Sequence, residues 1–102
     1  MAIADVEYKN GYYRIFDESN RKTIEKNEIH LGELKGFSSE YMVFYRNGYY
    51  SVYDEKFHKI TEKNEIHLGK YKNIAGGNIL FERNNYIGTY DEHLRKISER
   101  HV

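Results

Sequence analysis

The 102-residue chain repeats one pattern three times at a fixed spacing of 37 residues. The segment 9–13 (KNGYY) returns as 46–50 (RNGYY) and more loosely as 83–87 (RNNYI), and the segment 26–32 (KNEIHLG) reappears unchanged as 63–69. A repeat of this length indicates one supersecondary unit that buries its apolar surface only against its neighbours. We therefore expect a single domain over residues 1–102, with units at 4–25, 41–62 and 78–99 and connectors at 26–40 and 63–77.

Each unit contains the signal of a tight hairpin. An Asn-Gly pair between β-rich runs favours a type I′ turn, because both central residues of that turn need a positive φ. Asn10-Gly11 and Asn47-Gly48 fit this requirement, and Asn84-Asn85 is a weaker form of it, since Asn adopts positive φ less freely than Gly. A two-residue turn also fixes the register of the two strands. It places Val43 opposite Val52 and Phe81 opposite Gly88.

The same register separates the first unit from the other two. It pairs Glu7 with Arg14 at the column where the second and third units have Phe44 and Phe81. A charged pair suits solvent, so we expect the first unit to be an end of the array and the second, apolar on both faces, to be central.

Further strands are expected after each hairpin. The Asp-Glu pairs at 17–18, 54–55 and 91–92 predict turns in which the Asp side chain binds backbone amides. A third short strand follows each turn, and the segment 91–102 is expected to be strand rather than helix. In the connectors, 28–31 and 65–68 alternate polar and apolar residues, which predicts a fourth strand. The predicted fold is all-β: three 37-residue-period repeats of antiparallel hairpin units that form a meander or a small pseudo-threefold β assembly.

Composition and charge narrow the classes of function. Sixteen Lys and Arg balance 16 Asp and Glu, so the basic excess of a phosphate-backbone binder is missing and nucleic acid is disfavoured. There is no cysteine for a disulfide or a thiolate metal site. Residues 1–10 do not resemble a signal peptide, and no stretch approaches the roughly 18 apolar residues of a membrane span. These features predict a cytoplasmic protein without a membrane segment.

The second unit carries a motif that resembles a known family. Gly48-Tyr49-Tyr50-Ser51-Val52-Tyr53-Asp54, preceded by Phe37-Ser38, is similar to the bacterial WG (KWG) repeats, and Gly88 keeps the family's glycine in the third unit. The chain departs from the family in having no Trp, no proline-bearing return, and Arg14 in place of the small residue. The resemblance covers most of the chain and implies a β-repeat architecture with an interaction role, and the family has no catalytic residues to carry over.

Candidate chemistry is sparse. Asp91-Glu92-His93 has the composition of an acid–base cluster, but its Asp-Glu pair recurs in every unit, which favours a structural turn. His30 and His67 are repeat-related, but the sequence offers no third or fourth ligand for a metal. We therefore expect no enzyme activity, no cofactor and no metal.

The tyrosines are the strongest functional feature, because Tyr brings a large contact area at low entropic cost. The expected partner-binding residues lie on one repeat face, either as a binding surface or as packing between units: Tyr12, Tyr49, Tyr86, Tyr53, Tyr90, Arg46 and Arg83.

Three functions are compatible with this surface. The first is non-enzymatic protein binding, for example by a small inhibitor that covers a partner surface, as phage-encoded anti-CRISPR inhibitors of bacterial defence nucleases do. The second is single-strand nucleic-acid binding by a Tyr, Lys and Arg face, with a basic stripe formed by Lys22, Lys59 and Lys96 together with Lys9, Arg46 and Arg83. The third is a structural module that self-associates through unpaired sheet edges.

Overall fold

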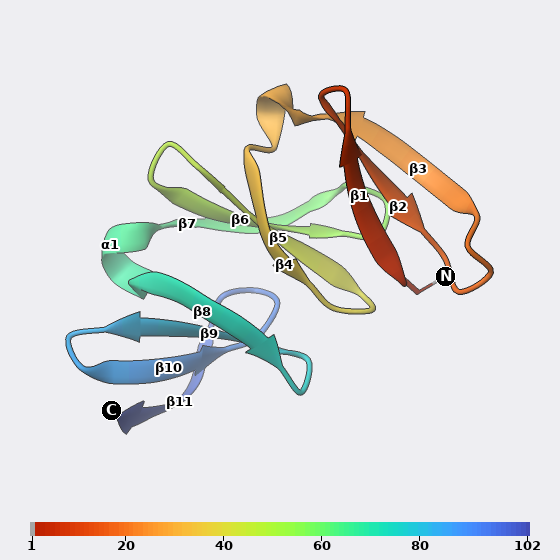
Figure 1. Ribbon diagram of the computed structural model, residues 1–102. Coiled ribbons are helices and arrows are strands. Elements are labelled where there is room, and N and C mark those ends of the chain that lie inside the picture. The colour runs from red at the N-terminus through yellow and green to blue at the C-terminus, as the bar shows by residue number, and fades with distance from the viewer. Residues whose placement is uncertain (1) are drawn as a thin grey trace.

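The computed structural model describes residues 2–102, and in that range it has three antiparallel sheets and two helical turns (Figure 1). The first sheet has the strand order β1(Asp5–Lys9), β2(Tyr12–Phe16) and β3(Lys22–Asn27). The second sheet has the order β4(Glu33–Phe37), β5(Tyr41–Arg46), β6(Tyr49–Asp54) and β7(Lys59–Asn64). The third sheet has the order β8(Lys70–Ala75), β9(Asn78–Arg83), β10(Tyr86–Tyr90) and β11(Lys96–His101).

The fold class predicted from the sequence is confirmed: the protein is all-β. The chain does not form one extended meander, however. Each sheet is its own up-and-down meander, and the three sheets follow one another along the molecule with the second in the middle (Figure 1). Equivalent strands begin at the repeat spacing, since β2, β6 and β10 start at Tyr12, Tyr49 and Tyr86.

The hairpin turns and their register are confirmed. Both residues of each turn have positive φ, with 53° at Asn10, 52° at Asn47, and 52° and 68° at Asn84 and Asn85. Val43 faces Val52 and Phe81 faces Gly88, as a two-residue turn requires. The third strands are also present as β3, β7 and β11, so the segment 91–102 contains a strand and not a helix.

The Asp turns that precede these third strands form as predicted. The Oδ1 atom of Asp17 accepts from the amides of Ser19 and Arg21 at 2.9 and 3.0 Å, and Asp54 and Asp91 accept from the equivalent amides. In the first of these turns, hydrogen bonds from the Arg21 and Ser19 amides hold the pKa of the Asp17 carboxyl below its ordinary value.

The predicted fourth strands at 28–31 and 65–68 are wrong. These segments are helical turns, η1(Glu28–His30) and α1(Glu65–Leu68), and the fourth strands β4 and β8 come after them. The side chains of Asn27 and Asn64 cap the turns by accepting from the amides two residues on, at 2.8 and 2.9 Å. The alternation of polar and apolar residues was misleading because Ile29 and Ile66 point into solvent.

The sheets pack face to face through two cores. Tyr13 meets Phe44 between the first and second sheets with ring centroids 5.1 Å apart. The repeat-equivalent pair, Tyr50 and Phe81, meets between the second and third sheets at 4.9 Å. Leu31 and Leu68 of the helical turns close these cores, with 1% and 2% of their surface exposed. The second sheet is thus buried on both faces, which confirms the prediction that the second unit is central.

The outer face of the first sheet is polar. Arg14 lies between two carboxylates, 3.8 Å from Glu7 and 3.3 Å from Glu25. This charged group occupies the column where the second and third sheets have Phe44 and Phe81. The prediction that the first unit is an end of the array with a polar face is therefore confirmed.

Candidate functional site

In the first and second sheets, the hairpin turn and a helical turn lie together at one end of the sheet. The amide of Glu28, at the start of η1, donates to the carbonyl of Gly11 at 2.9 Å, and the amide of Glu65 donates to Gly48 at the same distance. In the third sheet, the amide of Val102 donates to Asn85 at 2.8 Å. The Asp-Glu turns lie at the opposite ends of the sheets, because β1 and β2, β5 and β6, and β9 and β10 are each joined directly by their hairpin turn.

This hairpin end exposes several large side chains. Tyr12, Tyr49 and Tyr86 have 39%, 42% and 43% of their surface exposed. Ile29 and Ile66, on the helical turns, are 65% and 69% exposed. We call the following residues the hairpin-end surface: Tyr12, Tyr49, Tyr86, Arg46, Arg83, Ile29 and Ile66.

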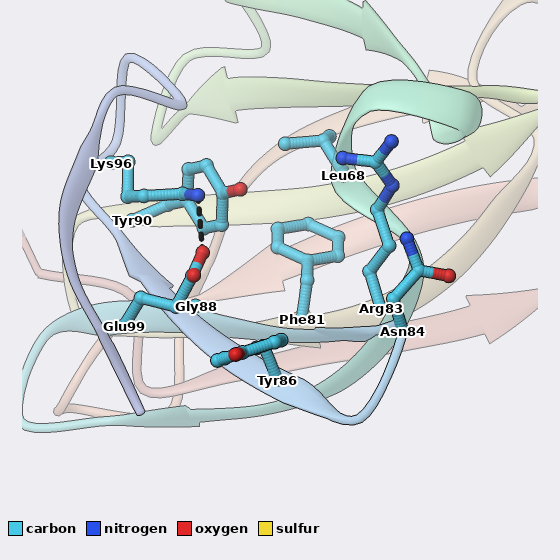
Figure 2. A pocket seen from close by; sticks show the side chains of 9 residues that line it. All are labelled: Leu68, Phe81, Arg83, Asn84, Tyr86, Gly88, Tyr90, Lys96 and Glu99. Carbon is cyan, nitrogen blue, oxygen red and sulfur yellow. Dashed lines mark hydrogen bonds and ion pairs between the residues drawn. The ribbon is translucent and has the colours of Figure 1, made fainter. Parts of the chain in front are cut away.

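Two hollows of about 260 Å³ each adjoin this surface, since Arg46 and Tyr49 line one and Arg83 and Tyr86 line the other. The first hollow is lined by His30, Arg46, Asn47, Tyr49, Ser51, Lys59 and Glu62. The second hollow, drawn in Figure 2, is lined by Leu68, Phe81, Arg83, Asn84, Tyr86, Gly88, Tyr90, Lys96 and Glu99. Six lining positions of the first hollow recur in the second at the repeat spacing. The sequence repeat therefore produces two copies of one site, each with Arg and Tyr at its rim.

Ion pairs inside each hollow partly neutralise the charged side chains that line it. Lys59 forms an ion pair with Glu62 at 2.5 Å, and Lys96 pairs with Glu99 in the second hollow (Figure 2). These contacts hold the pKa of the Glu62 carboxyl below its ordinary value and raise the pKa of the Lys96 ammonium. Each hollow also contains a second cation, the guanidinium of Arg46 or of Arg83, so its charged lining is positive by one. A carboxylate or a polarised carbonyl is the chemistry that such a rim attracts.

The floors of the two hollows differ at one position. In the first hollow, the Oγ atom of Ser51 donates to Glu62 at 3.1 Å. Gly88 takes that place in the second hollow, and Figure 2 shows the rings of Phe81 and Tyr90 at its floor. These two rings stand edge to face with centroids 5.5 Å apart. The second hollow therefore offers an aromatic floor that suits an apolar side chain.

The structure separates the predicted binding residues into two groups. Tyr12, Tyr49 and Tyr86 are exposed, and Arg46 and Arg83 line the hollows. Tyr53 and Tyr90 are only 5% and 7% exposed, and their rings belong to the cores between the sheets. They share the strand face of Tyr49 and Tyr86 as expected, but they serve the packing and are not part of the accessible surface.

Sequence reasoning missed Ile29 and Ile66. A strand at each of these sites would have placed the two isoleucines in the core. The helical turn that forms instead directs them into solvent. The signal that identifies the turn is the Asn cap at 27 and 64, followed by Gly five residues later at 32 and 69.

The other candidate residues do not form a catalytic or metal-binding cluster in the described part of the chain. Asp91 accepts hydrogen bonds from the amides of His93 and Arg95 at 2.8 and 3.0 Å, which makes it the anchor of a turn. His30 lines the first hollow. Within residues 2–102, no three His, Asp or Glu side chains converge to hold a metal ion. None of the helices in this range has the length and hydropathy to cross a membrane.

Comparisons with family models, with curated proteins and with solved structures found no match to this chain. The similarity to WG repeats therefore stays a prediction from the sequence motif.

Proposed function

We propose that the protein is a non-enzymatic binding module that recognises a protein partner through the hairpin-end surface. The observation that carries this proposal is the duplication of one site. Two hollows of equal volume have Arg, Asn and Tyr at equivalent positions, and an exposed Ile of a helical turn accompanies each. Tyr and Arg dominate the binding energy of protein interfaces, and charged rims around apolar floors are typical of them.

The charge pattern favours protein over nucleic acid. The expected basic stripe combines two columns, the first with Lys22, Lys59 and Lys96 and the second with Lys9, Arg46 and Arg83. Each lysine of the first column lies in contact with a glutamate three residues later, so the cations of that column are compensated. This leaves the second column alone to follow a phosphate backbone. A binder that tracks a phosphate backbone needs uncompensated charge, since its affinity comes from the release of counterions.

A more specific form of the proposal is that the protein inhibits the partner that it binds. A surface of shallow hollows and protruding side chains covers a partner rather than enclosing a small substrate. Covering an active site or a nucleic-acid channel of that partner blocks it, as anti-CRISPR-type inhibitors of bacterial defence nucleases do. This form predicts that the captured partner loses activity when the protein is added in stoichiometric amounts.

Site-specific photo-crosslinking tests the proposal. A benzoyl-phenylalanine is introduced at Tyr49 or at Tyr86, and in a control variant at His58. The imidazole of His58 is also exposed, with 75% of its side-chain surface accessible, but it lies in the turn at the opposite end of the second sheet. The full-length variants are irradiated in extract of the native host, and adducts are identified by mass spectrometry.

The expected result is one protein that is crosslinked at both Tyr49 and Tyr86 and not at His58. The same adduct at His58, or none at either tyrosine, contradicts a partner-binding role for this surface. Adducts with RNA at both tyrosines favour the nucleic-acid alternative, and adducts of the chain with itself favour self-association.

A further inference from the structure

One sequence position differs in side-chain size between the three copies of the repeat. It is occupied by Arg14 in the first sheet, by Ser51 in the second and by Gly88 in the third. The guanidinium of Arg14 lies 3.8 Å from Glu7 and 3.3 Å from Glu25, so it occupies the face of the first sheet. The side chain that covers the sheet at this position therefore becomes smaller from the first copy to the third.

The change from serine to glycine alters what lines the hollow. The rings of Phe81 and Tyr90 line the second hollow (Figure 2). Their equivalents, Phe44 and Tyr53, are not among the described residues that line the first hollow. The two ring pairs are placed alike, with centroids 5.5 and 5.6 Å apart. The residue beside the rings, and not the placement of the rings, therefore distinguishes the two hollows.

The first hollow is polar at the place where the second is apolar. The Oγ atom of Ser51 donates to Glu62 at 3.1 Å, and His30 of η1 also lines this hollow. The second hollow has Leu68 of α1 and the two rings instead. An apolar side chain that entered the first hollow would separate polar groups from water without giving them a partner, which is unfavourable. The second hollow imposes no such cost at its floor.

Each hollow also holds two interacting cations. Arg83 and Lys96 line the second hollow together with Glu99. The contact with Glu99 raises the pKa of the Lys96 ammonium, and repulsion from Arg83 opposes this rise. The first hollow has the same arrangement at the repeat spacing. An incoming carboxylate relieves the repulsion between the two cations and forms a charge-assisted hydrogen bond with the guanidinium.

The second hollow has the size of one side chain with a charged neighbour. Its volume is about 260 Å³, whereas pockets for drug-sized ligands measure about 300–1,000 Å³. The exposed ring of Tyr86 stands at its rim and adds apolar area for the entering group to cover. The lining therefore fits a carboxylate that stands next to an aromatic or branched apolar side chain.

We propose that the second hollow binds a segment of the partner protein in which a carboxylate adjoins an aromatic or branched apolar side chain, and that the first hollow excludes this apolar side chain. The apolar side chain lies against Phe81 and Tyr90, and the carboxylate pairs with Arg83. Because only one of the two hollows takes the apolar side chain, the partner binds the repeated surface in one orientation. This inference rests on the proposed function, since it names the partner chemistry of the same surface.

Chemical-shift titration of the ¹⁵N-labelled full chain tests the two hollows side by side. The probe is N-acetyl-phenylalanine, in which a carboxylate stands next to an aromatic side chain. N-acetyl-phenylalanine amide lacks the charge, and N-acetylglycine lacks the apolar side chain. N-acetyl-aspartyl-phenylalanine amide presents an internal acidic residue in place of a terminal carboxylate. The amides of Gly88 and Tyr90 report on the second hollow, and those of Ser51 and Tyr53 report on the first.

Two reciprocal variants exchange the floors of the hollows. Gly88→Ser copies the first hollow, and Ser51→Gly copies the second. The added Cβ atom at Gly88 would lie 2.8 Å from the ring of Tyr90, so this ring has to turn, but the second sheet already holds a serine beside the equivalent rings. Arg83→Gln removes the rim charge. Arg100→Gln is its matched control, because Arg100 is an exposed residue of β11 outside the described lining of the hollow.

We expect saturable shifts at the second hollow in the millimolar range and none at the first. The uncharged amide, N-acetylglycine, Gly88→Ser and Arg83→Gln should each weaken binding by at least about fivefold, and Arg100→Gln should bind within about twofold of the wild type. Ser51→Gly should give saturable shifts at Tyr53 as well. Both remaining outcomes support the proposal: tighter binding of the dipeptide assigns an internal acidic residue of the partner, and tighter binding of N-acetyl-phenylalanine assigns its C-terminus.

The proposal is overturned if neither carboxylate probe saturates at the second hollow in the millimolar range, if both hollows bind the probe equally, or if folded Gly88→Ser binds like the wild type. The amide spectrum shows whether each variant is folded, and if Gly88→Ser is not, Ser51→Gly decides the question. A negative titration with one protein crosslinked at Tyr49 and Tyr86 rejects this inference and keeps the proposed function. Saturable binding without those crosslinks rejects the proposed function alone.

Discussion

At the scale of single residues, two glycines end the helical turns in a conformation that other residues do not reach. Gly69 has φ of 96° and ψ of −150°, a region that only glycine occupies without strain. A Cβ atom at Gly69 would lie 2.3 Å from the carbonyl oxygen of Glu82, and at Gly32 it would lie 2.4 Å from that of Tyr45. The chain can therefore pass beside the neighbouring strand only where no side chain is present.

We predict that Gly69→Ala lowers the free energy of unfolding by at least about 3 kcal/mol, because backbone strain of about 1–3 kcal/mol adds to a clash with fixed backbone. Urea denaturation followed by circular dichroism measures this loss. Gly76→Ala is the matched control: Gly76 has φ of 58° and no atom within 4 Å of the added Cβ, so only about 1–2 kcal/mol is lost. Equal losses in the two variants would contradict the close approach at Gly69.

The buried hydroxyl of Tyr41 should lower the stability of the folded protein at alkaline pH. Its hydroxyl donates to the carbonyl of Gly77 at 2.7 Å, and burial raises its pKa from 10.0 to about 12. The folded-state pKa lies above the unfolded value, so the stabilisation is fully present below pH 10 and is lost as the pH rises toward about 12. We predict a loss of at most about 2.7 kcal/mol across this window from this group.

Urea denaturation at a series of alkaline pH values, compared between the wild type and Tyr41→Phe, measures the contribution of Tyr41. The variant keeps the ring but cannot ionise, so its stability should fall less steeply above pH 10. Identical slopes in the two proteins would show that the Tyr41 hydroxyl ionises at its ordinary pKa in the folded state.

At the scale of elements, the hairpins were predictable and the helical turns were not. Asn10-Gly11 and Asn47-Gly48 fix both the turn and the register, because the backbone requirement is local to two residues. The helical turns at 28–30 and 65–68 resemble strands in their alternation, and only the Asn caps distinguish them. Three or four residues carry too little periodicity to separate a strand from one turn of helix.

The third hairpin offers a test of the turn chemistry. Asn85 has φ of 68° at the position where the other two turns have glycine. We predict that Asn85→Gly stabilises the protein slightly, by about 0.5 kcal/mol, because glycine adopts this conformation without a steric cost. The reverse change, Gly48→Asn, should destabilise by a similar amount. Thermal unfolding measures both changes, and an effect of the same sign in both variants would contradict the type I′ assignment.

At the scale of the whole molecule, the repeat alone predicted that units pack on one another, and the charged pair of the first unit predicted which of its faces stays outside. That choice is settled by charge, since Glu7 and Arg14 keep the outer face of the first sheet in solvent while the equivalent Phe44 and Phe81 enter the cores. The hollows could not be predicted either, because they form at the mouth of each core, where residues of a helical turn and of a sheet meet.

The same reasoning explains the mixed outcome for the predicted site. Tyr49 and Tyr53 lie on one face of β6, as an alternating strand requires, but Tyr49 is near the open hairpin end and Tyr53 is deep between the sheets. Alternation predicts the face of a strand and does not predict the depth at which its residues lie.

The most direct test of the account is the affinity of the captured partner for hairpin-end variants. Tyr49→Ala and Tyr86→Ala should each weaken binding at least tenfold, since a Tyr that acts as an interface hot spot costs about 2 kcal/mol or more when it is truncated. The double variant should lose about a hundredfold, and His58→Ala should bind like the wild type. If the folded double variant binds within twofold of the wild type, the two repeat-related hollows are not the binding surface and the proposed function is wrong.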